Sequence, residues 1–190
     1  MFKHQVVAIG ALFAALAAPA LAAPPITLAA NGQWQQFLVD DLLSLGLGWK
    51  IDSGESAVFA FTIAPGDVGQ LTVVDGVFAG DTFNVTNFGN LLGITSPVPI
   101  TAFETPPADV GYDFAAALLN PAFSKGVYAL SAGSYAISGS LLQSVSLDDL
   151  PLNSTVGALR LTVTAVPEPT SVAMMVAGLL LFGAIARRRA

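Results

Sequence analysis

Hydrophobic and polar residues alternate along several short stretches in the middle of the chain. Between residues 82 and 86, Phe83 and Val85 are apolar, whereas the residues on either side of them are polar. A period of two is typical of a β-strand with one buried face. The same alternation recurs over residues 134–138 and 159–164, with Tyr135, Ile137, Leu159, Leu161 and Val163 on the apolar side.

Further strands are expected at the apolar or mixed runs 57–63, 71–78 and 127–130. Gly, Pro and Asp residues predict turns between the strands, at residues 65–67, 75–76, 79–81 and 132–133. Short strands joined in this way predict a mainly β fold, which we expect to be an antiparallel, jelly-roll-like β-sandwich. Residues 71–86 are expected to form two adjacent strands of one sheet, with Phe83 and Val85 facing the core.

Two segments have a helical pattern instead. A short helix is predicted over residues 113–119, because Asp113 is a favourable N-cap and Asn120-Pro121 ends the segment. A second helix is predicted over residues 33–45, where apolar residues recur with a period near 3.6, at Trp34, Phe37, Leu38, Leu42 and Leu45. The Pro-rich residues 95–109 are expected to be a loop.

The first 23 residues have the composition of a secretory signal. Lys3 supplies a basic start, and an almost wholly apolar run follows over residues 6–18. Ala20, Ala22 and Ala23 then provide the small residues of an A-x-A cleavage pattern. We expect an N-terminal signal helix that signal peptidase removes after Ala22 or Ala23. A retained membrane helix is the alternative, which the short run and the lack of a following charge cluster disfavour.

The end of the chain, residues 167–190, has three parts in order. They are the tripeptide Pro167, Glu168 and Pro169, an uncharged segment over residues 171–186, and the basic group Arg187, Arg188 and Arg189. As a helix the uncharged segment is roughly 24 Å long, slightly less than the hydrocarbon core of a bilayer. The arginines can extend to the cytoplasmic surface, where positive charge is favoured. The pattern predicts a transmembrane helix, with residues 24–166 outside the cell.

This tail resembles the PEP-CTERM sorting signal of Gram-negative bacteria, which has the same three parts in the same order. The resemblance implies that an exosortase, a membrane protease-transferase, recognises Pro167, Glu168 and Pro169. It implies that the helix anchors the protein transiently in the inner membrane, before delivery to the cell surface or extracellular matrix. A permanent single-pass anchor is the alternative.

The expected extracellular domain, residues 24–166, is acidic. It has three basic and twelve acidic residues, a net charge of about −9. Such a surface repels phosphate backbones, so nucleic acid is not an expected partner. The chain has no Cys, and its one histidine, His4, lies in the signal segment. Disulfides, thiolate or His-ligated metal sites, and His-dependent triads are therefore excluded from the domain, and no cofactor is expected.

Carboxylates are the remaining candidates for acid–base chemistry. Asp40 with Asp41, and Asp148 with Asp149, are neighbours in sequence, and neighbouring side chains on a helix or strand point apart. Solvated acids are therefore favoured over a catalytic pair.

Oxygen-bearing side chains also gather in the predicted turns, at Asp67, Asp75, Asp81 and Asn84. Asp75 and Asp81 are weak candidates for binding Ca²⁺, because no D-x-D-x-D-G loop is present. Asp residues that form turns are the favoured interpretation.

Large aromatic residues could stack on sugars, although rings in a small domain belong more often to the core. The candidates are Trp34, Trp49, Tyr112, Tyr128 and Tyr135.

Two hypotheses remain for function. The first is a non-catalytic surface or extracellular-matrix protein, sorted by exosortase and associated with exopolysaccharide. The second is a small secreted hydrolase that uses Asp carboxylates, which the lack of His and Cys disfavours.

Overall fold

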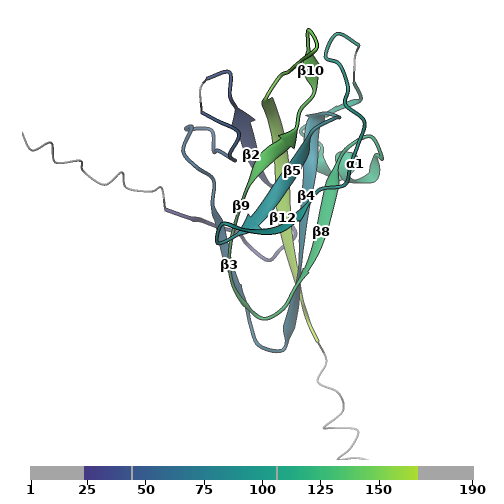
Figure 1. Cartoon of the computed structure of the whole chain (residues 1–190). Coiled ribbons are helices and arrows are strands. Elements are labelled where there is room, and N and C mark those ends of the chain that lie inside the picture. Colours follow the sequence, from purple (N-terminus) through teal and green to yellow (C-terminus); the bar gives the residue numbers. More distant parts are fainter. Residues whose placement is uncertain (1–23, 44, 106, 167–190) are drawn as a thin grey trace, which may run out of the picture.

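The computed structural model describes residues 24–43, 45–105 and 107–166. Strands dominate this part of the chain, which confirms the mainly β class (Figure 1). The elements are β1 (Ile26–Thr27), β2 (Gln35–Asp40), β3 (Phe59–Ile63), β4 (Asp67–Phe78), β5 (Thr82–Asn87), β6 (Asn90–Ile94), β7 (Asp109–Gly111), α1 (Phe114–Leu119), β8 (Lys125–Leu130), β9 (Gly133–Gln143), β10 (Ser146–Leu147), β11 (Leu150–Pro151) and β12 (Ser154–Ala165).

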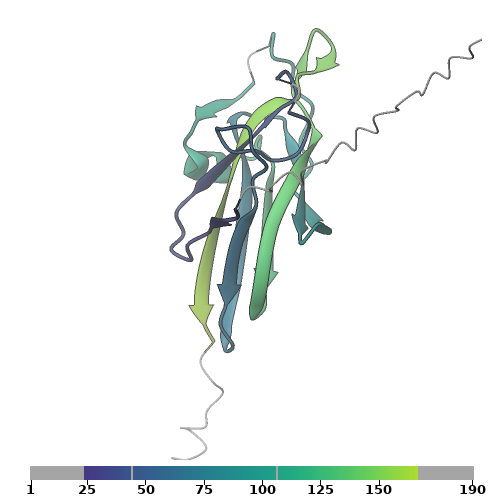
Figure 2. The same cartoon turned by 90° about the vertical axis from the view of Figure 1, so that its left-hand side faces the viewer.

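In the described residues, two large sheets face each other across a shared core, as Figures 1 and 2 show from two directions. The first has the strand order β1-β3-β9-β5-β6. The second has the order β2-β12-β4, and both β7 and β8 pair with β4. The long pairs are antiparallel, as predicted, whereas the short β1–β3 pair is parallel. The jelly-roll-like order of connections stays a prediction.

Aromatic rings fill the interior between the sheets. Phe37 of β2 stacks on Trp49 with ring centroids 3.8 Å apart, and Phe83 of β5 meets Phe37 edge-on at 5.1 Å. All three side chains are buried. Since β2 and β5 belong to opposite sheets, these contacts join the sheets through the core.

Strand β4 is covered on both faces. Leu71 and Val73 pack in the core between the sheets, whereas Val74 packs with Phe114 of α1 in a second cluster. A strand covered on both sides needs apolar residues at successive positions. This double burial explains why residues 71–74 lack the alternation seen elsewhere.

The turn predicted at Asp75 and Gly76 is wrong, because both residues continue β4. Gly76 pairs with Val156 of β12, and an added Cβ at Gly76 would lie 2.6 Å from the Phe114 ring. Glycine serves here for close packing rather than for chain reversal. The turns predicted at residues 65–67, 79–81 and 132–133 are confirmed, since each falls at the junction of two strands.

The two strands expected side by side within residues 71–86 lie in different sheets, so that prediction is wrong. β4 belongs to the second sheet and β5 to the first, and the chain crosses between them at residues 79–81. Phe83 and Val85 nevertheless face the core and are fully buried, as predicted. The alternation identified the buried face, but it carries no information about which strand is the neighbour.

The helix predicted over residues 33–45 is also wrong, because residues 35–40 form β2. Phe37 and Val39 are buried in the core, whereas Leu42 is 67% exposed. Burial in this segment therefore alternates as in a strand, although Phe37, Leu38 and Val39 are consecutive apolar residues. Backbone pairing of β2 with β12 outweighed a weak helical preference.

The short helix predicted at residues 113–119 is confirmed as α1. The Asp113 side chain accepts the Ala116 N–H at 2.9 Å, and the helix ends at Asn120, immediately before Pro121. Phe114 and Ala117 bury α1 against the outer face of the second sheet. The Pro-rich segment between β6 and β7 is a loop, as predicted.

Candidate functional site

Strand β12 runs along the length of the fold. Ala165 pairs with Asp67 at the start of β4, and Val156 pairs with Gly76 near the end of β4. At about 3.3 Å per residue, the two ends of β12 are roughly 36 Å apart. The candidate site lies at the Ser154 end, and the chain leaves the fold at the Ala165 end, at the bottom of Figure 1.

Asp75 is a carboxylate inside the fold. It lies two residues after Val73 in β4, so its side chain points to the same interior side, and it is 0% exposed. Its Oδ2 accepts the backbone N–H groups of Gly80 and Asp81, both at 3.2 Å. Its Oδ1 is buried and has no hydrogen-bond partner among the described residues. Asp75 thus holds the crossover between β4 and β5 from inside.

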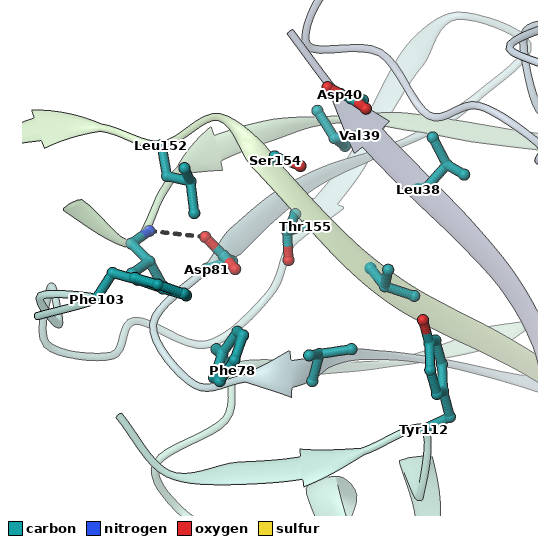
Figure 3. A pocket seen from close by; sticks show the side chains of 13 residues that line it. Leu38, Val39, Asp40, Phe78, Asp81, Phe103, Tyr112, Leu152, Ser154 and Thr155 are labelled. Atoms are coloured by element: carbon teal, nitrogen blue, oxygen red, sulfur yellow. Dashed lines mark hydrogen bonds between the residues drawn. The ribbon is translucent and has the colours of Figure 1, made fainter. Parts of the chain in front are cut away.

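Asp81 ties the same crossover to the segments that flank β10 and β11. It is 2% exposed, and its Oδ1 accepts the Val145 N–H at 2.8 Å (Figure 3). The hydroxyls of Thr155 and Ser144 also lie beside this carboxylate and lower its pKa. Three parts of the chain that are distant in sequence therefore meet at one acidic group.

Burial raises the pKa of both acids. Loss of water raises the pKa of Asp81 to about 6, against the hydrogen bonds from Thr155, Val145 and Ser144, which lower it. Burial also raises the pKa of Asp75 well above its usual range, and the nearby Asp81 charge adds to this effect. Near neutral pH, such a pair favours one neutral and one charged carboxyl group.

Asp81 borders an open pocket of about 330 Å³ (Figure 3). This volume lies near the lower end of the range for small-molecule sites, about 300 to 1,000 Å³. Its polar lining comes from Asp40, Asp81, Tyr112, Ser154 and Thr155. The apolar lining comes from Leu38, Val39, Val77, Phe78, Phe103, Val145, Leu152 and Val156.

Two of these polar residues are neighbours across a strand pair. Asp40 of β2 is the register partner of Ser154 of β12, so the two side chains lie at the same level of the pocket. Tyr112 follows β7 and is 67% exposed. Figure 3 shows the Tyr112 hydroxyl pointing toward β12. The pocket therefore combines a buried acid, a half-buried acid and an exposed aromatic ring.

The acid pairs singled out in the sequence lie in two different places. Asp41 is exposed, whereas Asp40 is half-buried and lines the pocket. Asp148 and Asp149 are exposed in the two-residue turn between β10 and β11, with φ values of 50° and 61°. Positive φ at both positions is typical of a tight hairpin turn. Asp148 and Asp149 therefore serve chain reversal.

The structure brings together two of the four oxygen donors considered for calcium. Asp75 and Asp81 are adjacent, whereas Asp67 lies at the other end of β4 and Asn84 lies within β5. In residues 24–43, 45–105 and 107–166, no group of three or more His, Cys, Asp or Glu side chains is placed to hold a metal ion. The hydrogen-bond partners of Asp75 are turn N–H groups, which fits an acid that stabilises a turn.

Packing involves four of the five aromatic candidates. Trp34, Trp49, Tyr128 and Tyr135 are buried or half-buried. The Arg160 guanidinium lies 4.5 Å from the Trp34 ring centre, and Tyr135 stacks on Phe61 at 5.1 Å. The Tyr112 ring is the candidate that stays largely open to solvent.

No local sequence pattern predicted the pocket, because its lining comes from separate segments of the chain. One local signal indicated a buried acid next to Asp81, although this acid does not itself line the pocket. Asp75 stands directly after the apolar residues 71–74 and before Val77 and Phe78, and a single acid in such a run is more often buried than an acid in a loop. The turn interpretation concealed this signal.

Several predicted functional residues lie outside the described residues. They are Ala20, Ala22 and Ala23 at the signal cleavage site, Pro167, Glu168 and Pro169 of the tripeptide, and Arg187, Arg188 and Arg189 at the end. Within the part of the chain that the structure describes, no helix is long and apolar enough to cross a membrane.

Comparison with solved structures found the crystal structure of the pre-peptidase C-terminal domain of a collagenase from Bacillus anthracis. The likeness has a TM-score of 0.38 and 10% sequence identity, and it covers 74% of this chain and 98% of that one. A comparison with curated proteins found no match.

A family model described as the PEP-CTERM protein-sorting motif matches residues 165–190. The match begins at the last residue of β12 and includes the tripeptide at residues 167–169 and the three terminal arginines. This motif implies export, with transient membrane anchoring by the C-terminal region. The chain therefore ends in a PEP-CTERM protein-sorting motif, as an exosortase substrate does.

Proposed function

We propose that this chain is a non-catalytic surface or extracellular-matrix protein whose folded domain adheres to exopolysaccharide after exosortase has processed the tail. The position of the pocket carries the proposal. The pocket opens at the Ser154 end of β12, whereas the sorting motif begins at Ala165, roughly 36 Å away. Removal of the tail beyond Ala165 would therefore leave the pocket lining at the Ser154 end intact and open to an extracellular polymer.

The composition of the pocket also suits a sugar. An exposed ring such as Tyr112 can pack on the C–H face of a pyranose, and the nearby polar groups of Asp40 and Ser154 can bind its hydroxyls. A pocket of about 330 Å³ accommodates one sugar unit of a longer chain. The domain would then hold the polymer without changing it.

Retention on polysaccharide tests the proposal. The processed protein, purified from its host, is passed over immobilised exopolysaccharide from the same cells. Retention without release of sugar products is expected, and Tyr112→Ala should weaken it. Phe88→Ala is the control, because Phe88 is 63% exposed on the β5–β6 turn and does not line the pocket. Failure of the wild type to bind, or equal weakening by both changes, contradicts adhesion through this pocket.

A small hydrolase is the second candidate, and one observation favours it. Asp40 and Asp81 line the same pocket, and the pKa of Asp81 is raised to about 6, which suits a general acid near neutral pH. Release of soluble sugars from the retained polymer, abolished by Asp81→Asn, would favour hydrolysis over adhesion. Retention without release favours the non-catalytic function.

A further inference from the structure

We propose that the pocket selects a sugar unit carrying a free amino group, so that the polymer recognised is a cationic, amine-bearing polysaccharide. This inference rests on the proposed adhesion and names the class of ligand. Three observations carry it: the charges that line the pocket, the placement of Asp40 and Tyr112, and the distribution of basic residues over the domain.

The charged side chains that line the pocket, Asp40 and Asp81, are both acidic. The three basic residues within positions 24–166 make their contacts outside the pocket. Lys125 donates to the Leu118 carbonyl at 2.7 Å, and Arg160 lies over Trp34. Lys50 lies 3.5 Å from the Ser56 hydroxyl and is not part of the lining. A ligand ammonium group would therefore supply a positive charge that the protein itself does not place in the pocket.

The two acids that could face an ammonium group differ in their exposure to water. Asp40 is half-buried at the level of Ser154, where water screens a charge only in part, and Asp81 lies deeper at 2% exposure. The Tyr112 ring adds an attractive face for a cation, because the face of an aromatic ring carries negative potential. A uronate sugar would bring a third negative charge to the same pocket. An N-acetylated sugar is neutral and would bring no positive charge to the two acids.

The whole domain favours the same ligand. Residues 24–166 carry a net charge of about −9, which attracts a polycation over several ångströms before contact. This attraction is not specific to the pocket. The experiment must therefore separate the contribution of the pocket from that of the net charge.

The experiment uses the processed protein from its host and three soluble probes of equal length. These are oligomers of glucosamine, oligomers of N-acetylglucosamine and oligomers of galacturonate. Binding is measured by calorimetry at about 150 mM ionic strength, which limits long-range attraction to roughly 8 Å. We expect the glucosamine oligomers to bind at least about tenfold more tightly than either other probe, as loss of a charge-assisted hydrogen bond implies.

Asp40→Asn is the main variant. The asparagine amide keeps an oxygen that can accept the Leu43 N–H, which Asp40 Oδ1 accepts at 3.1 Å, so the local fold is retained. Affinity for glucosamine oligomers should fall by about five- to tenfold. Asp149→Asn is the matched control, because it removes the same charge from an exposed turn position where Asn tolerates positive φ. Its affinity should stay within about twofold of the wild type.

The possible outcomes separate this inference from the proposed function. Equal affinity for the glucosamine and N-acetylglucosamine oligomers overturns the preference for an amine, although Tyr112-dependent adhesion still stands. If Asp40→Asn and Asp149→Asn lose the same affinity for glucosamine oligomers, the preference does not come from the pocket. It then comes from the net charge of the domain. Binding to none of the probes and to no host polysaccharide overturns both proposals.

Discussion

The carboxylate of Asp75 accepts the backbone N–H of Asp81 at 3.2 Å, which holds two acidic residues together inside the fold. Both side chains are almost completely removed from water. Their hydrogen-bond donors are the backbone N–H groups of Gly80, Asp81 and Val145. The stability of this end of the fold is therefore linked to protonation.

The domain should lose stability as the pH rises from about 4 to about 6. The pKa of Asp81 is raised to about 6 in the folded state, against about 3.9 in the unfolded chain, so the folded state binds more protons in this window. The stabilisation from the raised pKa of Asp81 is complete below about pH 4 and is lost as the pH passes through about 6. The change is on the order of 3 kcal/mol. Asp75, whose pKa is also raised, extends the loss to higher pH. Denaturant unfolding of the processed protein from pH 4 to 8 measures this change in the free energy of unfolding.

Relief of net negative charge at low pH also stabilises an acidic domain, and two variants separate this effect from that of Asp81. Asp81→Asn should flatten the pH profile between 4 and 6, because the titrating group is gone. Asp149→Asn, which removes an exposed charge, should leave the profile unchanged in shape. A profile that is equally steep in Asp81→Asn and the wild type would contradict the assignment.

Gly139→Ala should strongly destabilise the fold. Gly139 lies in β9, and an added Cβ would overlap the Asn84 carbonyl and lie 2.5 Å from the Trp49 ring. Neither neighbour can move freely, because Asn84 belongs to a paired strand and Trp49 is stacked on Phe37. The free energy of unfolding should fall by about 2 to 3 kcal/mol or more.

The control for this change is Gly48→Ala, since the nearest atom to a Cβ at Gly48 is 4.0 Å away. Its effect should stay within about 0.5 kcal/mol. Chemical denaturation of both variants measures the difference. Similar stability for the two would show that the sheets do not pack as closely as described.

Glu168→Ala should cause a full-length, membrane-bound precursor to accumulate. A sorting signal must be read by an enzyme, whereas a permanent anchor needs only its apolar segment and flanking charges. Replacing Arg187, Arg188 and Arg189 with neutral residues should impair either kind of tail, because the short apolar segment loses its cytoplasmic stop. Cell fractionation and immunoblotting follow both forms. Normal processing of Glu168→Ala would mean that the tail is only an anchor.

The exported protein should begin at Ala23 or Pro24. Cleavage there leaves β1 intact, in which the Ile26 N–H donates to the Val58 carbonyl at 2.7 Å and the Leu28 N–H donates to the Ala60 carbonyl at 3.0 Å. Mass spectrometry of the mature N-terminus measures the site. Recovery of peptides that contain Lys3 from the exported form would favour a retained membrane helix.

The local features of this chain could be predicted from the sequence alone. The alternation around Phe83 and Val85 identified a buried face, and Asp113 with Pro121 set the two ends of α1. The order of tripeptide, apolar segment and arginines indicated the sorting tail, which the family model confirms. Each of these signals lies within a few residues, where side-chain chemistry acts directly on the neighbouring backbone.

Only the tertiary structure decided which segments meet. Residues 35–40 became a strand because β12 offers them backbone partners, although their apolar spacing predicted a helix. β4 and β5 lie in opposite sheets, and Asp75 holds the crossover between them at residues 79–81 from inside. The pocket then formed from side chains of distant segments. Partner choice depends on packing across the whole core, and no local pattern encodes it.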